Sequence, residues 1–410
     1  MTIEVNGRKY ARPVQPLVVV CIDGSEPGYI EEAVKTGKAP FFAKVIESGM
    51  NRIAQCVVPS FTNPNNLSIV TGCPPSVHGI CGNFYYDIKN DAEVMMNDPE
   101  LLRTPTIFKV FQDTGYKMAI ITAKDKLRRL LGNGLTMKAG EACAFSSEVS
   151  DQCSLAEHGI EGVNALTGMA VPDVYSAELS EFVFAAGVKI MKRDRPELMY
   201  LSTTDYIQHK HAPGTPVAND FYIMMDRYLS QLDAMGCTIM ITADHGMNAK
   251  HKDDGTPNVI FLQDVLDGWY GIGATRVICP ITDPYVVHHG ALGSYVTVYL
   301  PADMDVRATL DKIASLGEID VALTRDEACT RFQLPADRLG DIVIVSAKNK
   351  VLGTTAARHD LSQLKEPLRS HGGISEQNVP LMSNKKCDLP ENVALRNFDA
   401  FFVGLNHLNS

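Results

Sequence analysis

Short runs of mostly apolar residues recur through the first 250 positions of the chain. They span residues 17–22, 117–123, 197–202 and 238–242. Near-continuous apolar runs of this length are typical of strands that are covered on both faces, as in a parallel sheet. Helix-like segments separate them, at residues 40–49, 106–115, 177–193 and 220–236. The alternation predicts a doubly wound α/β core with a mostly parallel sheet.

Each of these four apolar runs is followed by residues capable of chemistry. The residues are Asp23, Lys124, Asp205 and the adjacent pair Asp244 and His245. In doubly wound sheets the ligand lies beyond the carboxyl ends of the strands. We therefore expect these side chains to converge on one site.

The pattern changes from about residue 256. Two further β-rich runs, at 294–300 and 341–345, flank a helix-like stretch at 306–316, with Pro and Gly at the joints. This arrangement predicts a smaller α+β cap of residues 256–366, inserted into a core formed by residues 1–255 and 367–410.

Composition narrows the class of protein. At 410 residues with 45% hydrophobic content, the chain can bury a large core. A net charge of −10, without any block of Lys and Arg, argues against a nucleic-acid partner. No apolar stretch has the length of a signal peptide or of a membrane span. We expect a cytoplasmic protein with no membrane partner, whose ten cysteines, lacking any CxxC pair, are reduced.

A single hydroxyl, that of Thr62, begins a predicted short helix in the run Phe61-Thr62-Asn63-Pro64. Pro64 in the first turn costs no hydrogen bond, and the amides that follow point at any anion in front of Thr62. A phosphoryl group suits that position. The motif alone allows two interpretations: a nucleophile for phosphorus, or an ordinary N-cap hydroxyl.

Carboxylates and imidazoles recur at metal-ligand spacings. Asp205 and His209 are four residues apart, so one helical turn places both on one face. Asp244 and His245 are adjacent, and His371 precedes two glycines. Each residue alone has an ordinary structural explanation, but together they predict a metal centre. Mixed carboxylate and imidazole ligands suit zinc, iron or manganese better than magnesium.

The order of these motifs resembles the alkaline phosphatase superfamily, in its nucleotide pyrophosphatase/phosphodiesterase-like branch. The matching segments are Asp23-Gly24, the Thr62 run ending in Thr71-Gly72, Pro75-Ser76-Val77-His78-Gly79, Gly82-Asn83, Asp205 with His209, Asp244-His245-Gly246-Met247 and His371-Gly372-Gly373. Within the branch, nearly the whole chain, including residues 82–87 and Lys124-Asp125-Lys126, is similar to hydrolases that cleave the carbon–phosphorus bond of phosphonoacetate.

The resemblance implies two divalent metal ions, Zn²⁺ in the first place, with Fe²⁺ or Mn²⁺ as alternatives. It assigns one ion to Asp205, His209 and His371. It assigns the other to Asp23, Asp244, His245 and the Thr62 oxygen, and it gives Asn83 a phosphonate oxygen to bind. The pair His288 and His289 mimics a His-Gly motif, but it lies in the predicted cap, where the family has no ligand.

The implied reaction is a two-step displacement in which two metals clamp the phosphoryl group and Thr62 becomes phosphorylated. The leaving group is a carbanion, which departs only if its charge spreads onto the neighbouring carboxylate. Lys124 and Lys126 are the candidates to hold that carboxylate, because residues two apart in an extended segment share a face. Otherwise they form a solvated strand end.

Two alternatives remain at this stage. A cytoplasmic phosphodiesterase or phosphomonoesterase would use the same metal core on phosphorus–oxygen bonds. A non-catalytic metal or phosphonate sensor would keep the ligands without turnover. The sequence favours a small phosphonate as the binding partner and leaves open whether the chain forms a homodimer.

Overall fold

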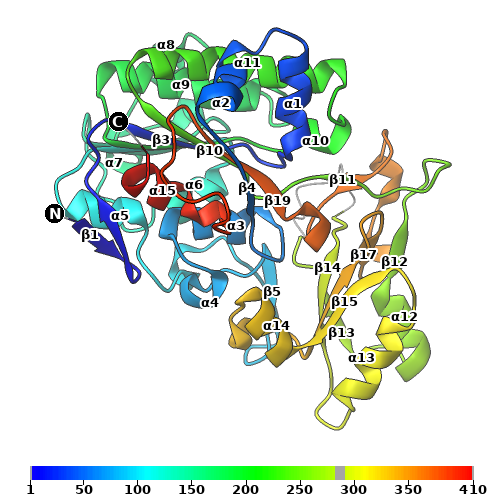
Figure 1. Ribbon diagram of the computed structural model, residues 1–410. Helices are drawn as coiled ribbons and strands as arrows, with labels where there is room; N and C mark the ends of the chain where they lie inside the picture. Colours follow the sequence, from blue (N-terminus) through cyan, green and yellow to red (C-terminus); the bar gives the residue numbers. More distant parts are fainter. Residues whose placement is uncertain (1, 282–290, 409–410) are drawn as a thin grey trace.

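The computed structural model describes residues 2–281 and 291–408, so His288 and His289 lie outside the described residues. The chain forms a core around a seven-stranded sheet and a smaller lobe around a four-stranded sheet (Figure 1). Both termini belong to the core side of the molecule.

The central sheet is mostly parallel, as predicted. Its strand order is β4 (Met50–Gln55), β19 (Asn378–Ser383), β10 (Thr238–Thr242), β3 (Leu17–Cys21), β9 (Leu198–Ser202), β7 (Met118–Thr122) and β8 (Ala142–Ser146). Only β19 runs against its neighbours. The four apolar runs are the adjacent strands β10, β3, β9 and β7, so their carboxyl ends meet at one edge.

Alternate side chains of each central strand enter two separate apolar clusters, one on each face. In β3, Val18 and Val20 face one cluster, whereas Leu17 and Val19 face the other. The first cluster is covered by α1 (Pro27–Lys35), α2 (Pro40–Ser48), α9 (Glu178–Arg193) and α11 (Pro216–Ala234). The second is covered by α3 (Thr62–Thr71), α5 (Ile107–Asp113), α6 (Asp125–Leu131) and α15 (Ala400–Asn406). These are the two helix layers of a doubly wound fold (Figure 1).

The direction of β19 and β4 brings two further segments to the same edge. Because β19 runs opposite to the parallel strands, the segment that precedes it, including His371, arrives at their carboxyl ends. Because β4 is antiparallel to β19, its own carboxyl end leads through residues 56–61 into α3. The start of α3, with Thr62, therefore lies at the edge where the polar strand ends converge.

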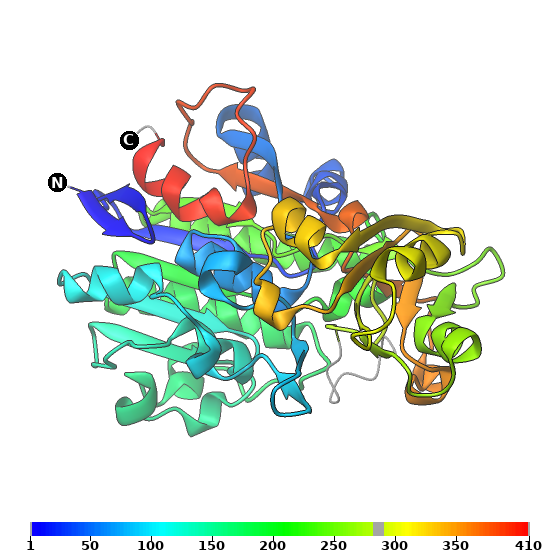
Figure 2. The same cartoon turned by 90° about the horizontal axis from the view of Figure 1, so that it is seen from below.

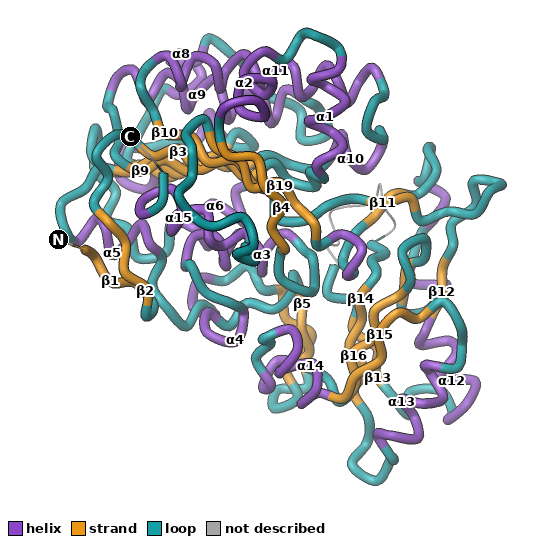
Figure 3. The backbone as a smooth tube through the Cα atoms, viewed as in Figure 1, coloured by secondary structure: helices purple, strands orange, loops and turns teal. Residues whose placement is uncertain are grey.

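The smaller lobe is an antiparallel sheet with helices beside it (Figures 2 and 3). Its strands, in order, are β13 (Arg276–Ile278), β14 (Tyr295–Tyr299), β16 (Ile342–Ser346) and β15 (Ile319–Thr324). Beside them lie α12 (Leu262–Tyr270), α13 (Val306–Ala314), α14 (Arg325–Phe332), and the parallel pair β12 (Val259–Phe261) and β17 (Val351–Gly353).

A hairpin from the core side packs on this lobe. It consists of β5 (Phe84–Asp87) and β6 (Ala92–Met95). The ring of Tyr86 meets Tyr299 edge-on with centroids 5.1 Å apart, and the Arg276 guanidinium lies 4.1 Å from the Tyr86 centroid. The boundaries of the inserted cap at 256 and 366 stay a prediction. The hairpin lies outside that range of residues, yet it contacts the smaller lobe.

The remaining strands and α-helices are short. They are β1 (Thr2–Val5), β2 (Arg8–Ala11), α4 (Pro75–His78), α7 (Leu155–His158), α8 (Val163–Thr167), α10 (Tyr206–Lys210), β11 (Asn248–Ala249) and β18 (Arg369–Ser370). All ten cysteines fall within the described residues and are free thiols, as predicted. In the described ranges, no helix combines the length and the hydrophobicity needed to cross a bilayer.

Candidate active site

A cavity of about 610 Å³ opens at the carboxyl edge of the central sheet. Its lining includes eight of the residues predicted from the sequence, namely Asp23, Thr62, Asn83, Lys124, Lys126, Asp205, His209 and His371. The other two, Asp244 and His245, are fully buried next to it: Asp244 Oδ1 accepts a hydrogen bond from the Gly24 amide at 3.2 Å, and His245 Nε2 lies 3.3 Å from Asp23 Oδ1. The structure thus brings all ten residues together.

Asp205 lies at the centre of the Asp and His cluster. It precedes α10, and His209 follows one turn later, which places His209 Nε2 2.9 Å from Asp205 Oδ2. His371 Nε2 lies 3.6 Å from the same oxygen. These three residues can hold one metal ion, and Asp23, Asp205 and His245 form a second such group. Asp205 is shared by both groups, whereas the resemblance placed Asp244 in the second. The division of ligands between two ions stays a prediction.

A close backbone approach makes this convergence feasible. Gly24, directly after Asp23, has a φ of +71°, and a Cβ at that position would lie 2.9 Å from Asp205 Cβ. A larger residue would therefore be strained and would push the strand end of Asp23 away from Asp205.

All three imidazoles of the cluster are oriented by backbone carbonyls. Nδ1 of His209 bonds to the Arg369 carbonyl at 2.8 Å, Nδ1 of His371 to that of Ser60 at 2.7 Å, and Nδ1 of His245 to that of Gly246 at 2.9 Å. Since a carbonyl can only accept, each Nδ1 carries the proton. Each Nε2 is left with its lone pair toward the cluster, which is how metal-binding histidines are usually held.

The electrostatics of the cluster fit a bound cation. Among the described residues, Asp23 Oδ1 and His245 Nε2 are buried without a hydrogen-bond partner, an arrangement that costs about 1–3 kcal/mol per group. Burial, with Asp205 and Asp244 nearby, raises the pKa of Asp23 well above its usual value. A divalent ion would satisfy both orphaned atoms and offset the repulsion between the carboxylates.

Thr62 is the first residue of α3, and the N-cap is Phe61. The interpretation of Thr62 as an N-cap hydroxyl is therefore wrong. Asn66, one turn later and fully buried, was not predicted. Its Nδ2 donates to the Thr62 carbonyl at 3.1 Å and to Asp244 Oδ2 at 3.2 Å, and its Oδ1 accepts from the Tyr200 hydroxyl at 2.7 Å. Asn66 ties the Thr62 turn to Asp244. The only sequence signal was a run of Asn around Pro64, residues with poor helix propensity.

Asn83 lines the cavity in a defined orientation. Its Oδ1 accepts the backbone N–H of Asn63 at 3.3 Å, which turns its Nδ2 donors away from α3. The Asn83 backbone N–H is bonded to the Pro280 carbonyl at 2.9 Å. An amide held in this way can donate to an anionic oxygen in the cavity.

Lys124 and Lys126 both line the cavity, but the expected extended segment is wrong. Lys124 is the N-cap of α6, and Lys126 lies in its first turn. The helix begins here because the Asp125 N–H donates to Glu148 Oε2 at 2.8 Å and the Asp125 carboxylate accepts from Arg128 Nε at 3.0 Å. Lys124 is half-buried, Lys126 is exposed, and Lys124 Nζ lies 6.0 Å from the centroid of the Tyr175 ring.

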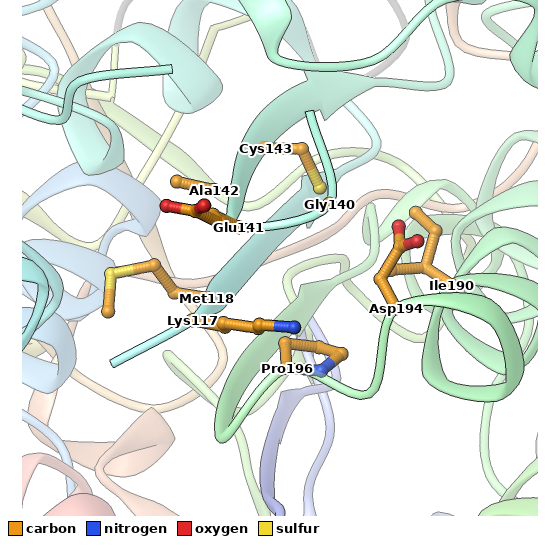
Figure 4. Close-up of a pocket in the computed structure, with 9 residues that line it drawn as sticks. All are labelled: Lys117, Met118, Gly140, Glu141, Ala142, Cys143, Ile190, Asp194 and Pro196. Carbon is orange, nitrogen blue, oxygen red and sulfur yellow. The ribbon is translucent and has the colours of Figure 1, made fainter. Parts of the chain in front are cut away.

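A second, much smaller cavity lies at the opposite edge of the sheet, at the amino ends of β7 and β8 (Figure 4). Its volume is about 10 Å³, and Lys117, Glu141 and Asp194 are among its lining residues. A space of this size holds about one water molecule at most. It therefore does not compete with the cavity at the carboxyl edge as a ligand site.

Comparison with known families agrees with this geometry. Residues 17–374 match the type I phosphodiesterase/nucleotide pyrophosphatase family. The chain therefore belongs to this family, which is a family of hydrolases.

Among solved structures, the chain is similar to phosphonoacetate hydrolase from Sinorhizobium meliloti 1021, with 57% sequence identity and a TM-score of 0.96. The match covers 99% of this chain and 98% of that one. That enzyme was crystallised in complex with phosphonoacetate and with phosphonoformate. Murine ectonucleotide pyrophosphatase/phosphodiesterase 5 matches 96% of this chain and 96% of its own at 16% identity, with a TM-score of 0.62, which shows the shared fold.

Proposed function

We propose that the protein is a metal-dependent hydrolase that cleaves the carbon–phosphorus bond of phosphonoacetate to give acetate and phosphate. The observation that carries the proposal is the combination, in one cavity, of Thr62 and an Asp and His cluster with two lysines, Lys124 and Lys126. The 57% identity to a phosphonoacetate hydrolase crystallised with phosphonoacetate supports the same substrate.

In this proposal Asp205, His209 and His371 hold one divalent ion. Asp23, Asp244 and His245, with the Thr62 oxygen, hold a second. Zn²⁺ is our first expectation, with Fe²⁺ or Mn²⁺ as alternatives, because all three accept mixed carboxylate and imidazole ligands. When bound, such ions supply Lewis-acid stabilisation of the negative charge on the phosphoryl group.

The first chemical step is attack of Thr62 Oγ1 on phosphorus. The O–P bond forms while the C–P bond breaks, and the electron pair of that bond leaves with the CH₂ carbon. The charge spreads onto the adjacent carboxylate. The CH₂ group takes up one proton to become acetate, which balances the proton lost from the Thr62 hydroxyl.

In the second step water attacks the phosphothreonine, the bond between phosphorus and Thr62 Oγ1 breaks, and phosphate and the free hydroxyl are regenerated. Asn83 donates to a phosphoryl oxygen in both steps, because its Nδ2 group is turned away from α3 by its contact with Asn63. Lys124 and Lys126 act on the other end of the substrate. Two ammonium groups at its carboxylate would stabilise the enediolate-like charge of the first transition state.

A second candidate function is hydrolysis of phosphate esters, and the match to a family of phosphodiesterases favours it. That reaction needs the same nucleophile and metal cluster. It needs no carbanion stabilisation, because an alkoxide or phenolate leaves instead. The two lysines would then have no specific role in the reaction.

The deciding experiment measures product release from three substrates side by side: phosphonoacetate, phosphonoacetaldehyde and a nitrophenyl phosphodiester. We expect phosphonoacetate to have the highest kcat/KM and to give acetate and phosphate in equal amounts. A higher kcat/KM for the phosphodiester, with no acetate from phosphonoacetate, would replace the proposal by the second candidate.

A further inference from the structure

A buried ion pair lies beside the metal cluster and takes no part in the proposed chemistry. Lys250 Nζ is 2.9 Å from Glu376 Oε1, and both side chains are 0% exposed. Lys250 follows β11, a few residues after His245, and Glu376 closes a short 3₁₀ turn (Ile374–Glu376) that follows His371. These segments lie where the chain passes between the core and the smaller lobe (Figure 1).

Glu376 is bonded to both loops that carry the histidines. Its Oε2 accepts the Gly373 N–H at 2.9 Å, two residues after His371. Its backbone carbonyl accepts the Gly246 N–H at 2.8 Å, directly after His245. One residue thus fixes the position of the two loops relative to each other.

The carboxylate of Glu376 is in turn saturated with donors. Its Oε1 accepts from Lys250 Nζ, from Asn248 Nδ2 at 2.6 Å and from Ser375 Oγ at 2.6 Å. Lys250 Nζ also donates to the Lys348 carbonyl of the smaller lobe at 2.6 Å. Removing one partner would leave a buried charge uncompensated and shift the loops that depend on it.

Stability alone does not explain such a pair. A buried ion pair costs desolvation that its attraction repays only in part, and apolar replacements of similar volume are often as stable. The distinctive consequence here is geometric. The rings of His245 and His371 are stacked with centroids 3.5 Å apart and planes 7° from parallel, so a small shift of either loop changes how their Nε2 atoms point.

We propose that Glu376, held by Lys250, is a positioning residue that sets the spacing of His245 and His371, and thereby the spacing of the two metal sites. The inference rests on the ligand assignment of the proposed function. It predicts that breaking the pair weakens metal binding and lowers kcat, with little change in KM, for phosphonoacetate and phosphate esters alike.

The test compares Glu376→Gln, Lys250→Met, the double variant and Lys250→Arg, each stripped of metal and titrated with Zn²⁺ by calorimetry. Glu376→Gln and Lys250→Met should bind at least one of the two ions about 10-fold or more weakly, as is typical when the support of a metal ligand is lost. Lys250→Arg keeps the charge and should stay closer to wild type. The double variant should not recover wild-type Zn²⁺ affinity, because it still carries Glu376→Gln, which alters the contact with the Gly373 N–H.

A matched control is Lys350→Met. Lys350 also pairs with a glutamate, Glu318, within the smaller lobe. Its link to the His371 loop runs through its backbone carbonyl, which accepts from Ser294 Oγ and which the substitution leaves in place. This variant should keep wild-type Zn²⁺ affinities even if its melting temperature falls. Ser375→Ala, which removes one hydrogen bond to Glu376, serves as a milder variant with an intermediate loss should Glu376→Gln not fold.

Three results would overturn the proposal. One is a set of variants whose melting temperatures fall while both Zn²⁺ affinities and kcat stay within about twofold of wild type. Another is full recovery in the double variant, which would reduce the pair to charge neutralisation. The third is wild-type protein that binds fewer than two ions, which removes the ligand assignment itself. By contrast, normal binding of two ions without phosphonoacetate turnover would refute the proposed substrate and leave the positioning role intact.

Discussion

The two ends of the active-site cavity are built differently. At the phosphoryl end, Asp244 and His245 are fully buried, and the Nδ1 atom of each histidine in the cluster is bonded to a backbone carbonyl. At the other end, where the proposed mechanism places the leaving group, Lys124 is half-buried, and Lys126 and Tyr175 are exposed. The first end is preorganised by contacts from several strands and helices. The second depends on the first turn of one short helix, α6.

On the proposed function, this difference separates the chemistry at phosphorus from the recognition of the leaving group. A nucleophile with a buried Asp and His cluster acts on phosphorus whatever group leaves. In the proposed mechanism the two lysines contact only the leaving group. Changes at the phosphoryl end should therefore affect all substrates, whereas changes at the lysine end should affect phosphonoacetate alone.

The largest effect should follow removal of metal. We expect a chelator to abolish activity on phosphonoacetate and on phosphate esters together, and Zn²⁺, Mn²⁺ or Fe²⁺ to restore both. Asp205→Asn should weaken ion binding by more than about 100-fold, because Asp205 is a proposed ligand of one ion and its carboxylate also lies close to Asp23 and His245. Elemental analysis of active protein gives the check, and fewer than about two ions per chain would contradict the two-ion assignment.

Thr62→Ala should fold and bind metal, yet lose activity on both substrates by at least about a thousandfold, because the nucleophile is gone. Thr71→Ala is the matched control. Thr71 lies at the other end of α3, where its hydroxyl bonds to the Leu67 carbonyl. Substantial turnover by Thr62→Ala would show that water attacks phosphorus directly and that no phosphothreonine forms.

Asn83→Ala should lower kcat/KM for both substrates by about 100-fold, the usual loss when one donor to a developing oxyanion is removed. Asn83 is proposed to contact the phosphoryl group, which both substrates share. The ratio of kcat/KM for phosphonoacetate to that for the phosphate ester should therefore hardly change. Steady-state kinetics on both substrates test this. A loss confined to phosphonoacetate would place Asn83 at the leaving-group end instead.

The next effect concerns the stability of the fold rather than turnover, through the support of α3. Burial, helped by Arg338, lowers the pKa of His78 to about 3, and its Nε2 lies 2.9 Å from Ser68 Oγ in α3. In the unfolded chain His78 takes up its proton near the ordinary histidine pKa of 6.5, whereas the folded chain resists protonation until much lower pH. The contribution of neutral His78 to the free energy of unfolding is therefore complete above pH 6.5. It is lost as the pH falls toward 3, by up to about 1.4 kcal/mol per pH unit.

Urea unfolding of wild type and His78→Gln at a series of pH values measures this contribution. The free energy of unfolding should fall less steeply with acidification in the variant. Parallel curves for the two proteins would mean that His78 does not carry the acid sensitivity.

Much of the core and most of the site could be predicted from the sequence, for a physical reason. Buried parallel strands need continuous apolar runs, and the polar residues that end them are then brought together by the fold. The pair Asp205 and His209 shows this well, since a spacing of four in a helix allows little choice. Strand β4 was missed because its residues alternate between buried and exposed, so no apolar run marks it.

Other features depend on burial, which one sequence does not reveal. Asn66 and Glu376 appear as ordinary polar residues until the fold encloses them. The segment at Lys124 was predicted as extended. The helix that begins there could not be foreseen, because the N–H of Asp125 is bonded to Glu148, which is distant along the chain. The cap boundaries, the identity of the metal, a cytoplasmic location and a homodimer stay predictions.

The most direct test of the division between the two ends is the substrate selectivity of Lys124→Ala and Lys126→Ala. For each variant we would measure kcat/KM with phosphonoacetate and with a nitrophenyl phosphate ester. Loss of a charge-assisted contact at the carboxylate should cost about 2 to 4 kcal/mol at the transition state for phosphonoacetate, while the ester is hydrolysed nearly as well as by wild type. Equal losses on both substrates would show that the lysines serve the phosphoryl group or the fold, and would contradict the account.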